Sequence, residues 1–477
     1  MRKLFSGIIL VLLSATAIAQ AGISNPYSRF GIGILDPTGS VNHFAIGGIT
    51  SSIIDPNAIN LFNPATYSNL SRTTLQLSGK GGVQNITNGS ASETFRSGQV
   101  SEIAFGFKKQ GAKWGVSLGL VPYSTVGYNL TSPVVVNDST SASYKYDGSG
   151  GINRLVIGFG RSFRIYKMPN YNTALTGTAK LNDENRVKEL RDSLAIVKPR
   201  LSAGVNLNYL FGTMRQESRV EFASSRYFST KNTTRTTVLD FTLDAGFQYF
   251  MPLRLKWDNK KLRNGVYLNI GASYTLGGDL KSKNETLGEL YILSSGRESV
   301  VDTTYFEPIE NGVITVPSRL TTGASVIWAG QEGRTTVLSF EFKNQNWNNF
   351  SSSFEGTLTA NELTAYSNIA LGLERTPRNT EAANNILERT TYRIGVRNTN
   401  TYLNVRDQNI VQQAVSAGVS IPILSSRSTS RFNFAVEYGR GGTTTNGLLE
   451  EDFVNVQLGF SLTPHFLNPW FVQRRYD

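Results

Sequence analysis

Apolar and polar residues alternate with a period of two along much of this chain. Between Thr236 and Tyr249, one face of the segment is apolar and the other is small or polar. The apolar face contains Phe241, Leu243, Ala245, Phe247 and Tyr249, and the opposite face contains Thr242, Asp244, Gly246 and Gln248. Because successive side chains of a β-strand point to opposite faces of its sheet, this spacing predicts a strand with one apolar side.

The same alternation recurs in further segments, and no long linker separates them. They lie near residues 102–108, 115–121, 154–160, 204–209, 266–274, 338–342, 415–421, 432–438 and 454–462. Their less apolar faces are mostly Gly, Ser, Ala, Asn and Gln, which suit a crowded or water-filled lumen better than the water-exposed face of a soluble sandwich. The pattern predicts an all-β fold, a transmembrane antiparallel β-barrel of about 14 strands.

Several intervals lack the alternation and are predicted to be loops. These intervals are Asn85 to Gln99, Met168 to Pro199, Asp279 to Pro317, Asn344 to Thr364 and Thr376 to Arg389. Between Asn182 and Val197 the apolar spacing becomes helical, with Asp183 placed to cap the first turn. We expect a short amphipathic helix there, which either packs on its own loop or docks on another protein.

The N-terminus has the features of a secretory signal peptide. Arg2 and Lys3 precede the apolar stretch from Ile8 to Leu13, and Ala17-Ile18-Ala19 forms a small-x-small cleavage site. The apolar run is shorter than the roughly 20 residues that a spanning helix needs. We therefore expect residues 1–19 to direct export through the Sec pathway and to be removed before Gln20, with the mature barrel in the cell outer membrane.

Composition narrows the possible partners. Cysteine is absent, so neither disulfides nor thiolate metal sites are expected. The formal charge is +12, and it is +10 without Arg2 and Lys3. The cations are scattered through loops and strand ends rather than gathered on a helix, which argues against nucleic acid. The expected roles of this charge are contacts with outer-membrane lipid and lipopolysaccharide phosphates, snorkelling at the membrane interface, or a lumen that accepts anions.

The sequence offers little for catalysis. His43 and His465 are the two histidines, and neither falls on a predicted barrel strand. No His-Glu-x-x-His motif is present, and the acidic run Glu450-Glu451-Asp452 lacks the spacing of a calcium loop. We therefore predict a protein that is not an enzyme and that holds no metal and no cofactor.

The segment before the first predicted strand is of a different kind. Proline and glycine interrupt residues 20–70, notably in Asn25-Pro26-Tyr27-Ser28-Arg29-Phe30 and in Asp55-Pro56, before Asn63-Pro64-Ala65. We predict that residues 20–70 fold inside the lumen as a plug, that residues 71–462 form the barrel with extracellular loops, and that residues 463–477 form a tail. A periplasmic N-terminal tail is the alternative to the plug.

The order of these N-terminal motifs resembles the hatch of the FadL-type outer-membrane transporters. The residues that carry the resemblance are Asn25, Pro26, Tyr27, Arg29, Phe30, Asp55, Asn63, Pro64 and Ala65. The opening motif and the C-terminal residues resemble a Bacteroidetes subgroup that includes PorV-like proteins. The resemblance implies a 14-stranded barrel with a hatch. This chain has Thr66-Tyr67 where the transporters usually have a glycine, so the hatch turn is expected to differ.

Two functions are compatible with such a barrel. In the first, which the polar lumen and basic charge favour, it is a plugged scaffold or accessory subunit of a larger outer-membrane secretion or protein-assembly complex, with other outer-membrane or periplasmic subunits as partners. In the alternative, it is a FadL-type transporter of a hydrophobic ligand such as a fatty acid or hydrocarbon. The tail is a candidate for partner binding through Trp470, Phe471, Arg474, Arg475 and Tyr476.

Cleavage of the signal peptide can be measured directly. N-terminal sequencing of the protein purified from outer membranes is expected to begin at Gln20, because Ala17 and Ala19 supply the small residues that signal peptidase requires. Recovery from the outer membrane of a chain that still begins at Met1 would contradict the prediction.

Overall fold

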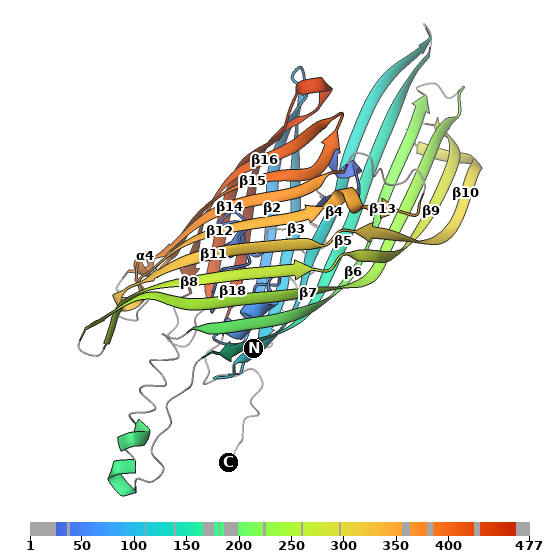
Figure 1. Ribbon diagram of the computed structural model, residues 1–477. Coiled ribbons are helices and arrows are strands. Elements are labelled where there is room, and N and C mark those ends of the chain that lie inside the picture. The colour runs from blue at the N-terminus through green and yellow to red at the C-terminus, as the bar shows by residue number, and fades with distance from the viewer. Residues whose placement is uncertain are drawn as a thin grey trace, which may run out of the picture.

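The strands of this protein form one antiparallel sheet that closes on itself. The computed structural model describes residues 25–35, 39–109, 111–137, 140–165, 176–180, 182–185, 199–222, 226–258, 261–294, 297–354, 363–378, 385–423 and 430–463. Within these residues the sheet has 18 strands, and β18 pairs with β2 to close the barrel (Figure 1). The strands of the first half are β2 (Thr74–Thr87), β3 (Ser92–Phe107), β4 (Trp114–Asn137), β5 (Thr140–Arg164), β6 (Arg200–Phe222), β7 (Ser229–Asp258), β8 (Lys261–Thr275) and β9 (Gly278–Ser294). Those of the second half are β10 (Arg297–Val316), β11 (Arg319–Ala329), β12 (Thr335–Asn346), β14 (Ala365–Thr376), β15 (Thr391–Val405), β16 (Gln408–Pro422), β17 (Arg431–Gly442) and β18 (Glu450–Leu462).

The prediction of about 14 strands is confirmed for the part of the barrel that the structure describes. Two strands of two residues each, β1 (Ile34–Leu35) and β13 (Ser351–Ser352), are not part of the wall. The pairs β8–β9 and β10–β11 each trace a single wall strand with a short break, because β7 pairs first with β9 and then with β8. Counting each pair once leaves 14 strands around the barrel.

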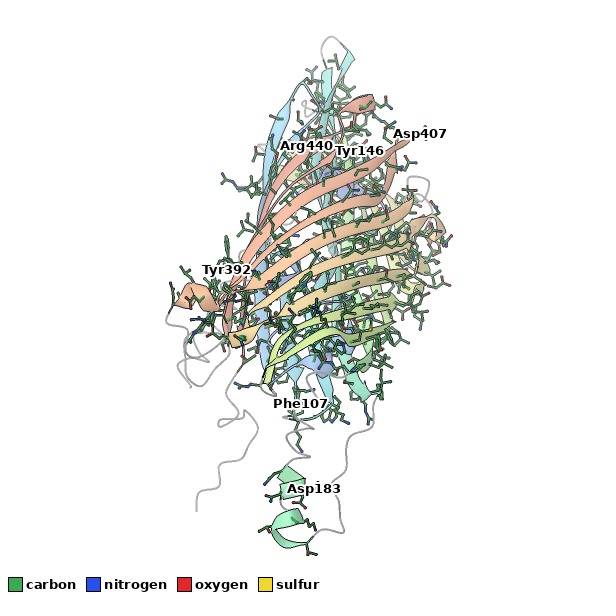
Figure 2. All side chains as sticks on the ribbon, turned by 60° about the vertical axis from the view of Figure 1, so that its left-hand side comes forward. Phe107, Tyr146, Asp183, Tyr392, Asp407 and Arg440 are labelled. Atoms are coloured by element: carbon green, nitrogen blue, oxygen red, sulfur yellow. The ribbon has the colours of Figure 1, made fainter. Side chains whose placement is uncertain are left out.

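The two ends of the barrel are distinct. An even number of strands puts the start of β2 and the end of β18 at the same end, which we call the base, and we call the opposite end the rim. Asp407, Tyr146 and Arg440 lie toward the rim, whereas Phe107 and Tyr392 lie toward the base (Figure 2). The turns at the base that join β7 to β8 and β11 to β12 span only a few residues.

The alternating faces are arranged as predicted. Phe241 is 59% exposed on the outside, while Asp244 and Gln248 are almost completely buried on the inside. The same outward exposure holds for apolar residues of every wall strand around the middle of the barrel, including Ile157, Val205, Ile270, Leu338, Ile369, Val415 and Leu458. An apolar outer belt of this kind is the surface that a bilayer requires of a β-barrel.

Two predicted loops prove to be strands. Residues of Asn85 to Gln99 extend β2 and β3, and Asp279 to Pro317 forms most of β9 and β10. These segments lie at the rim, where apolar residues no longer keep to alternate positions, and Val300, Val301, Phe306 and Ile309 of β10 are all exposed. Alternation is therefore weak in their sequence, although the backbone pairing continues.

The predicted loop from Asn344 to Thr364 contains η4 (Trp347–Asn349) and β13 in its described part, and that from Thr376 to Arg389 contains α4 (Ile386–Arg389). Residues 182–185 are helical, and the remainder of the helix expected between Asn182 and Val197 falls outside the described residues. In the part of the chain that the structure covers, no helix is long and apolar enough to cross a membrane.

Candidate functional site: the plugged lumen

The N-terminal segment before β2 lies against the inward side of the barrel wall. We call residues 25–35 and 39–70 the plug. It contains η1 (Pro26–Arg29), β1, α2 (Val41–Phe44) and η2 (Pro64–Asn69). Its residues Ile49, Ile59 and Tyr67 are fully buried. The plug touches inward-facing residues of strands on all sides of the wall.

Wall glycines make room for the backbone of the plug. A Cβ added to Gly271 would lie 2.0 Å from the carbonyl oxygen of Ser51, and one added to Gly395 would lie 2.2 Å from the carbonyl carbon of Ile46. We call eight positions at which an added Cβ would come within 3 Å of a backbone or side-chain atom of the plug the glycine row: Gly115, Gly160, Gly204, Gly246, Gly271, Gly323, Gly372 and Gly395. In β4 to β7 the first four are direct cross-strand partners. Close backbone approach of this kind requires glycine.

Two Asn-Pro motifs begin the two 3₁₀ helices of the plug in the same way. The side chain of Asn25 accepts a hydrogen bond from the amide of Tyr27 at 2.9 Å, and Asn63 accepts one from Ala65 at 3.1 Å. Each asparagine then uses its amide group outside the turn. Asn63 donates to the carbonyl of Ser51 at 2.8 Å, and Asn25 donates to Glu451 on β18. The motif residues are thus turn-forming residues that also fix the plug's position.

The first helix of the plug is held at the rim. The hydroxyl of Tyr27 donates to the carbonyl of Leu449 at 2.7 Å, and the guanidinium of Arg29 lies 5.0 Å from the ring centre of Tyr146. Phe30 packs on the apolar cluster described below, and its carbonyl accepts a hydrogen bond from Tyr402 at 3.3 Å. These contacts connect the plug to three separate parts of the wall and its loops.

A wall carboxylate holds the centre of the plug. Glu341 of β12 is fully buried and accepts hydrogen bonds from the amides of Thr50 at 2.7 Å and Ser51 at 2.5 Å. Lys343 forms an ion pair with Glu341 at 3.0 Å and donates to the carbonyl of Gly48 at 2.7 Å. A buried charge needs such compensation, and removing one partner typically costs about 3–5 kcal/mol.

Asp55 joins a second ionic group, in which Arg393 is buried and the two carboxylates are partly buried. Its carboxylate accepts a hydrogen bond from Asn42 at 3.1 Å and lies 3.6 Å from the guanidinium of Arg393 on β15. Arg393 also donates to Glu374 on β14 at 2.6 Å. The cavity lined by these residues has a volume of about 10 Å³, which leaves room for one water molecule at most.

A third polar group lies beneath the end of the plug. The hydroxyl of Tyr67 donates to the side chain of Asn206 at 2.9 Å, and Asn206 donates to the carbonyl of Leu61 at 3.0 Å. Asn206 also contacts Asp244, which pairs with Arg154 at 3.6 Å. Ala65 is fully buried in the same region.

His43 is enclosed within the plug. Its Nδ1 lies 2.8 Å from the hydroxyl of Ser40, and both side chains are almost fully buried. Burial lowers the pKa of His43 to about 4, so the imidazole is neutral at pH 7. Because no substrate can reach this pair, the contact serves packing of the plug. His465 lies outside the described residues.

Apolar side chains fill the lumen toward the rim. Ile32 of the plug joins Ile152, Leu210, Val238, Ile314 and Trp347 in one cluster, and each of these six is at most 1% exposed. Trp347 stacks on Tyr402 with 4.6 Å between ring centres. Near-zero exposure leaves no water-sized space beside these side chains, so this part of the lumen is a packed core.

In the described residues the pairing between β3 and β4 is interrupted, and the plug partly covers the gap. β3 and β4 pair only from Ile103 to Phe107 and from Val116 to Leu120, although both strands continue well toward the rim. We call the stretch of β3 before Ile103, together with the stretch of β4 after Leu120, the seam. There β1 pairs with Ser124 and Thr125, and the amide of Asn25 donates to the carbonyl of Gly127 at 2.7 Å.

The closed barrel, its apolar belt and the N-terminal segment against its inner wall define an outer-membrane β-barrel. A family model described as BamG matches residues 1–172 and 190–477, so the chain belongs to the BamG family. Among the curated proteins no sequence matches the chain.

Solved structures of transport proteins are similar in fold. The toluene transporter TbuX of Ralstonia pickettii has 14% identity and a TM-score of 0.50, with 90% of this chain and 99% of that chain covered. The P. putida toluene transporter TodX has 16% identity and a TM-score of 0.48, covering 90% and 99%. A Pseudomonas aeruginosa FadL homologue has 13% identity and a TM-score of 0.45, covering 91% and 100%. TbuX is named as a toluene transporter, and transport is the alternative of the two functions expected from the sequence, but at 14% identity the likeness shows the fold alone.

Sequence reasoning located the plug motifs but missed their partners in the wall. Glu341, Lys343 and Arg393 are isolated charged residues in apolar strands, and that isolation at inward positions is the signal that could have indicated them. The tail residues Trp470, Phe471, Arg474, Arg475 and Tyr476 lie outside the described residues, and their role stays a prediction.

The glycine row can be tested by adding a single methyl group. We expect Gly271→Ala to destabilise the barrel by about 1–3 kcal/mol, because the new Cβ overlaps the carbonyl of Ser51. Thermal unfolding in detergent measures the effect. Gly79→Ala is the matched control, since its nearest neighbour would be 3.7 Å away. Equal melting temperatures for the two variants would contradict the close-packed plug.

The buried histidine predicts a dependence on pH. The pKa of His43 in the folded protein is about 4, below its ordinary value of 6.5. Above pH 6.5 the imidazole is neutral in both the folded and the unfolded chain, so the protein has its full stability there. Between pH 6.5 and 4 the unfolded chain takes up a proton that the folded chain excludes, which removes up to about 3 kcal/mol. The loss of melting temperature between pH 7.5 and 4.5 should be smaller in His43→Gln than in the wild type. Parallel losses would show that His43 makes no contribution.

Proposed function

We propose that this protein is a plugged scaffold or accessory subunit of a larger outer-membrane secretion or protein-assembly complex. The observation that carries the proposal is the fit between the glycine row and the backbone of the plug. The gaps are too small even for a methyl group, so movement of the plug would require the wall to separate from it. A lumen filled in this way serves as a structural core.

The buried ionic groups support the same conclusion. Glu341 satisfies two plug amides, and Arg393 links Asp55 of the plug to Glu374 of the wall. Withdrawal of the plug would leave these charges without their partners inside the barrel. A transport cycle that withdrew the plug would require the free energy of separating these charges at every turnover.

An exposed strand edge at the rim offers a place for a partner. β10 pairs with β9 on one side, and in the described residues its other edge pairs only with β13, at Ile314 and Thr315. Phe306 and Ile309 on this strand are 56% and 63% exposed. Soluble proteins usually cover or charge such an edge, because it can pair with another chain. Coverage of β10 by another subunit is consistent with the scaffold function.

Locking the plug to the wall tests the proposal. The hydroxyl of Ser52 in the plug lies 2.7 Å from that of Ser325 in β11, so the Ser52→Cys and Ser325→Cys pair is positioned to form a disulfide. The chain has no other cysteine. We expect the locked protein, tagged and purified from its host in mild detergent, to retain the same stoichiometric outer-membrane partner as the wild type. Recovery of the wild-type barrel alone, with a fatty acid bound, would contradict a scaffold.

The matched control places both cysteines in the wall. Ser325 and Ser339 have hydroxyls 2.8 Å apart on β11 and β12, so a disulfide between Ser325→Cys and Ser339→Cys crosses two wall strands and leaves the plug free. A partner retained by this control and lost from the locked plug would show that the plug moves during function.

The second candidate function is transport of a hydrophobic small molecule, and the seam between β3 and β4 favours it. Missing pairing there leaves a place where the wall could release a solute sideways if β1 moved away. The same two disulfides distinguish the candidates. If the protein is a transporter, uptake of a labelled fatty acid or toluene should stop in the variant with the plug locked by a disulfide and return when that disulfide is reduced. Uptake should continue in the control with the disulfide between two wall strands.

A further inference from the structure

The apolar belt ends abruptly on one side of the base. Five outward-facing residues in direct cross-strand register on β7, β8, β11, β12 and β14 are all apolar: Met251, Leu268, Val326, Leu338 and Leu373. The next outward row toward the base is different, and its members are Arg254, Val266, Trp328, Thr336 and Arg375. The boundary between hydrocarbon and headgroup region therefore falls between these two rows.

A cavity opens on the outer surface at this boundary. It has a volume of about 630 Å³ and is lined by Trp328, Arg254, Lys256 and Arg334, with Asn264 and Thr336 between them. The three cations come from β7 and from the turn between β11 and β12. Glu332, the acidic residue of the lining, is paired with Arg378 at 2.7 Å. The cavity consequently carries a net positive charge.

A local irregularity in the backbone of β7 turns the side chain of Arg254 outward. The register of β7 shifts between Pro252 and Arg254, where the strand has a β-bulge. A bulge of this kind changes the direction of the following side chains, and here Arg254 becomes the outward neighbour of Val266. Arg254, Lys256 and Arg334 are all exposed. Trp328 is 42% exposed between the cations and the apolar belt.

We propose that this cavity, the basal lipid site, binds the phosphate of an anionic glycerophospholipid. Guanidinium and ammonium groups bind phosphate oxygens, and an indole ring prefers the level of the headgroups. The acyl chains would then lie over Leu268 and Val326, which are the belt residues next to Val266 and Trp328.

The position of the cavity at the base determines which class of lipid can reach it. At the rim β9 and β10 run well beyond the apolar belt, whereas at this side of the base β7 and β8, and likewise β11 and β12, turn back close to it, as at the periplasmic end of outer-membrane barrels. The periplasmic leaflet of such membranes is built from glycerophospholipids, whereas lipid A carries its phosphates in the opposite leaflet. The proposal is independent of whether the lumen conducts.

Native mass spectrometry of the full, delipidated protein with added phosphatidylglycerol tests the site. We expect the triple variant Arg254→Gln, Lys256→Gln and Arg334→Gln to lower the affinity on the order of a hundredfold, since each cation near an anionic lipid adds about 1 kcal/mol. The matched control removes three exposed cations at the rim, through Arg215→Gln, Arg235→Gln and Arg440→Gln. Its affinity should equal that of the wild type. Equal affinity of the basal triple variant and the wild type would overturn the proposal.

Further ligands distinguish the sources of the phosphate. Diacylglycerol, which lacks the phosphate, should not compete, and neither should inorganic phosphate, which lacks the chains. Displacement of phosphatidylglycerol by lipid A at lower concentration, or by inorganic phosphate alone, would contradict a glycerophospholipid site.

A second readout needs no change of charge. Phosphatidylglycerol brominated on its acyl chains should quench the fluorescence of Trp328, so Trp328→Phe should remove most of the quenching. Unchanged quenching in Trp328→Phe would place the lipid elsewhere on the barrel and reject the site.

Discussion

The close approach between wall glycines and the plug backbone is the constraint on which the rest of the structure depends. At Gly271 and Gly395 a single added carbon would occupy the position of plug atoms. Inward positions of the wall must therefore be small at this level, and apolar bulk is confined to the outside, where the bilayer takes it. The alternation visible in the sequence is the consequence of two surfaces, lipid and plug, that each strand must satisfy at once.

Electrostatic contacts also hold the plug against the wall. Glu341 and Arg393 are buried charges at the wall, and their partners include backbone amides and side chains of the plug. In a low-dielectric interior such groups are tolerated only when each is compensated. The plug and the wall are consequently parts of one core, and the apolar cluster around Ile32 and Trp347 continues that core toward the rim. A filled core favours the scaffold function, while the seam beside β1 is the feature that keeps transport in consideration.

The sequence was sufficient for the wall and insufficient for what holds the plug. Strands such as 241–249 could be predicted because lipid on one side imposes apolar residues at every second position. β10 could not, because it lies beyond the lipid and is exposed along most of its length, so no period remains in its residues. The pairing of Asp55 with Arg393 could not be predicted either, since it joins residues far apart in the chain, and only closure of the barrel brings them together. The Asn-Pro motifs were visible as turns, but their contacts with the wall, such as Asn25 with Glu451, were not.

Hydrogen–deuterium exchange of the plug amides tests the central claim, that the plug is a fixed part of the core, most directly. The amides of Thr50 and Ser51 donate to the buried Glu341, and they should exchange as slowly as the paired amides of β11 and β12. If these plug amides exchange orders of magnitude faster than the amides of the wall strands, the plug separates from the wall in solution. That result would contradict the claim that the plug is a fixed part of the core.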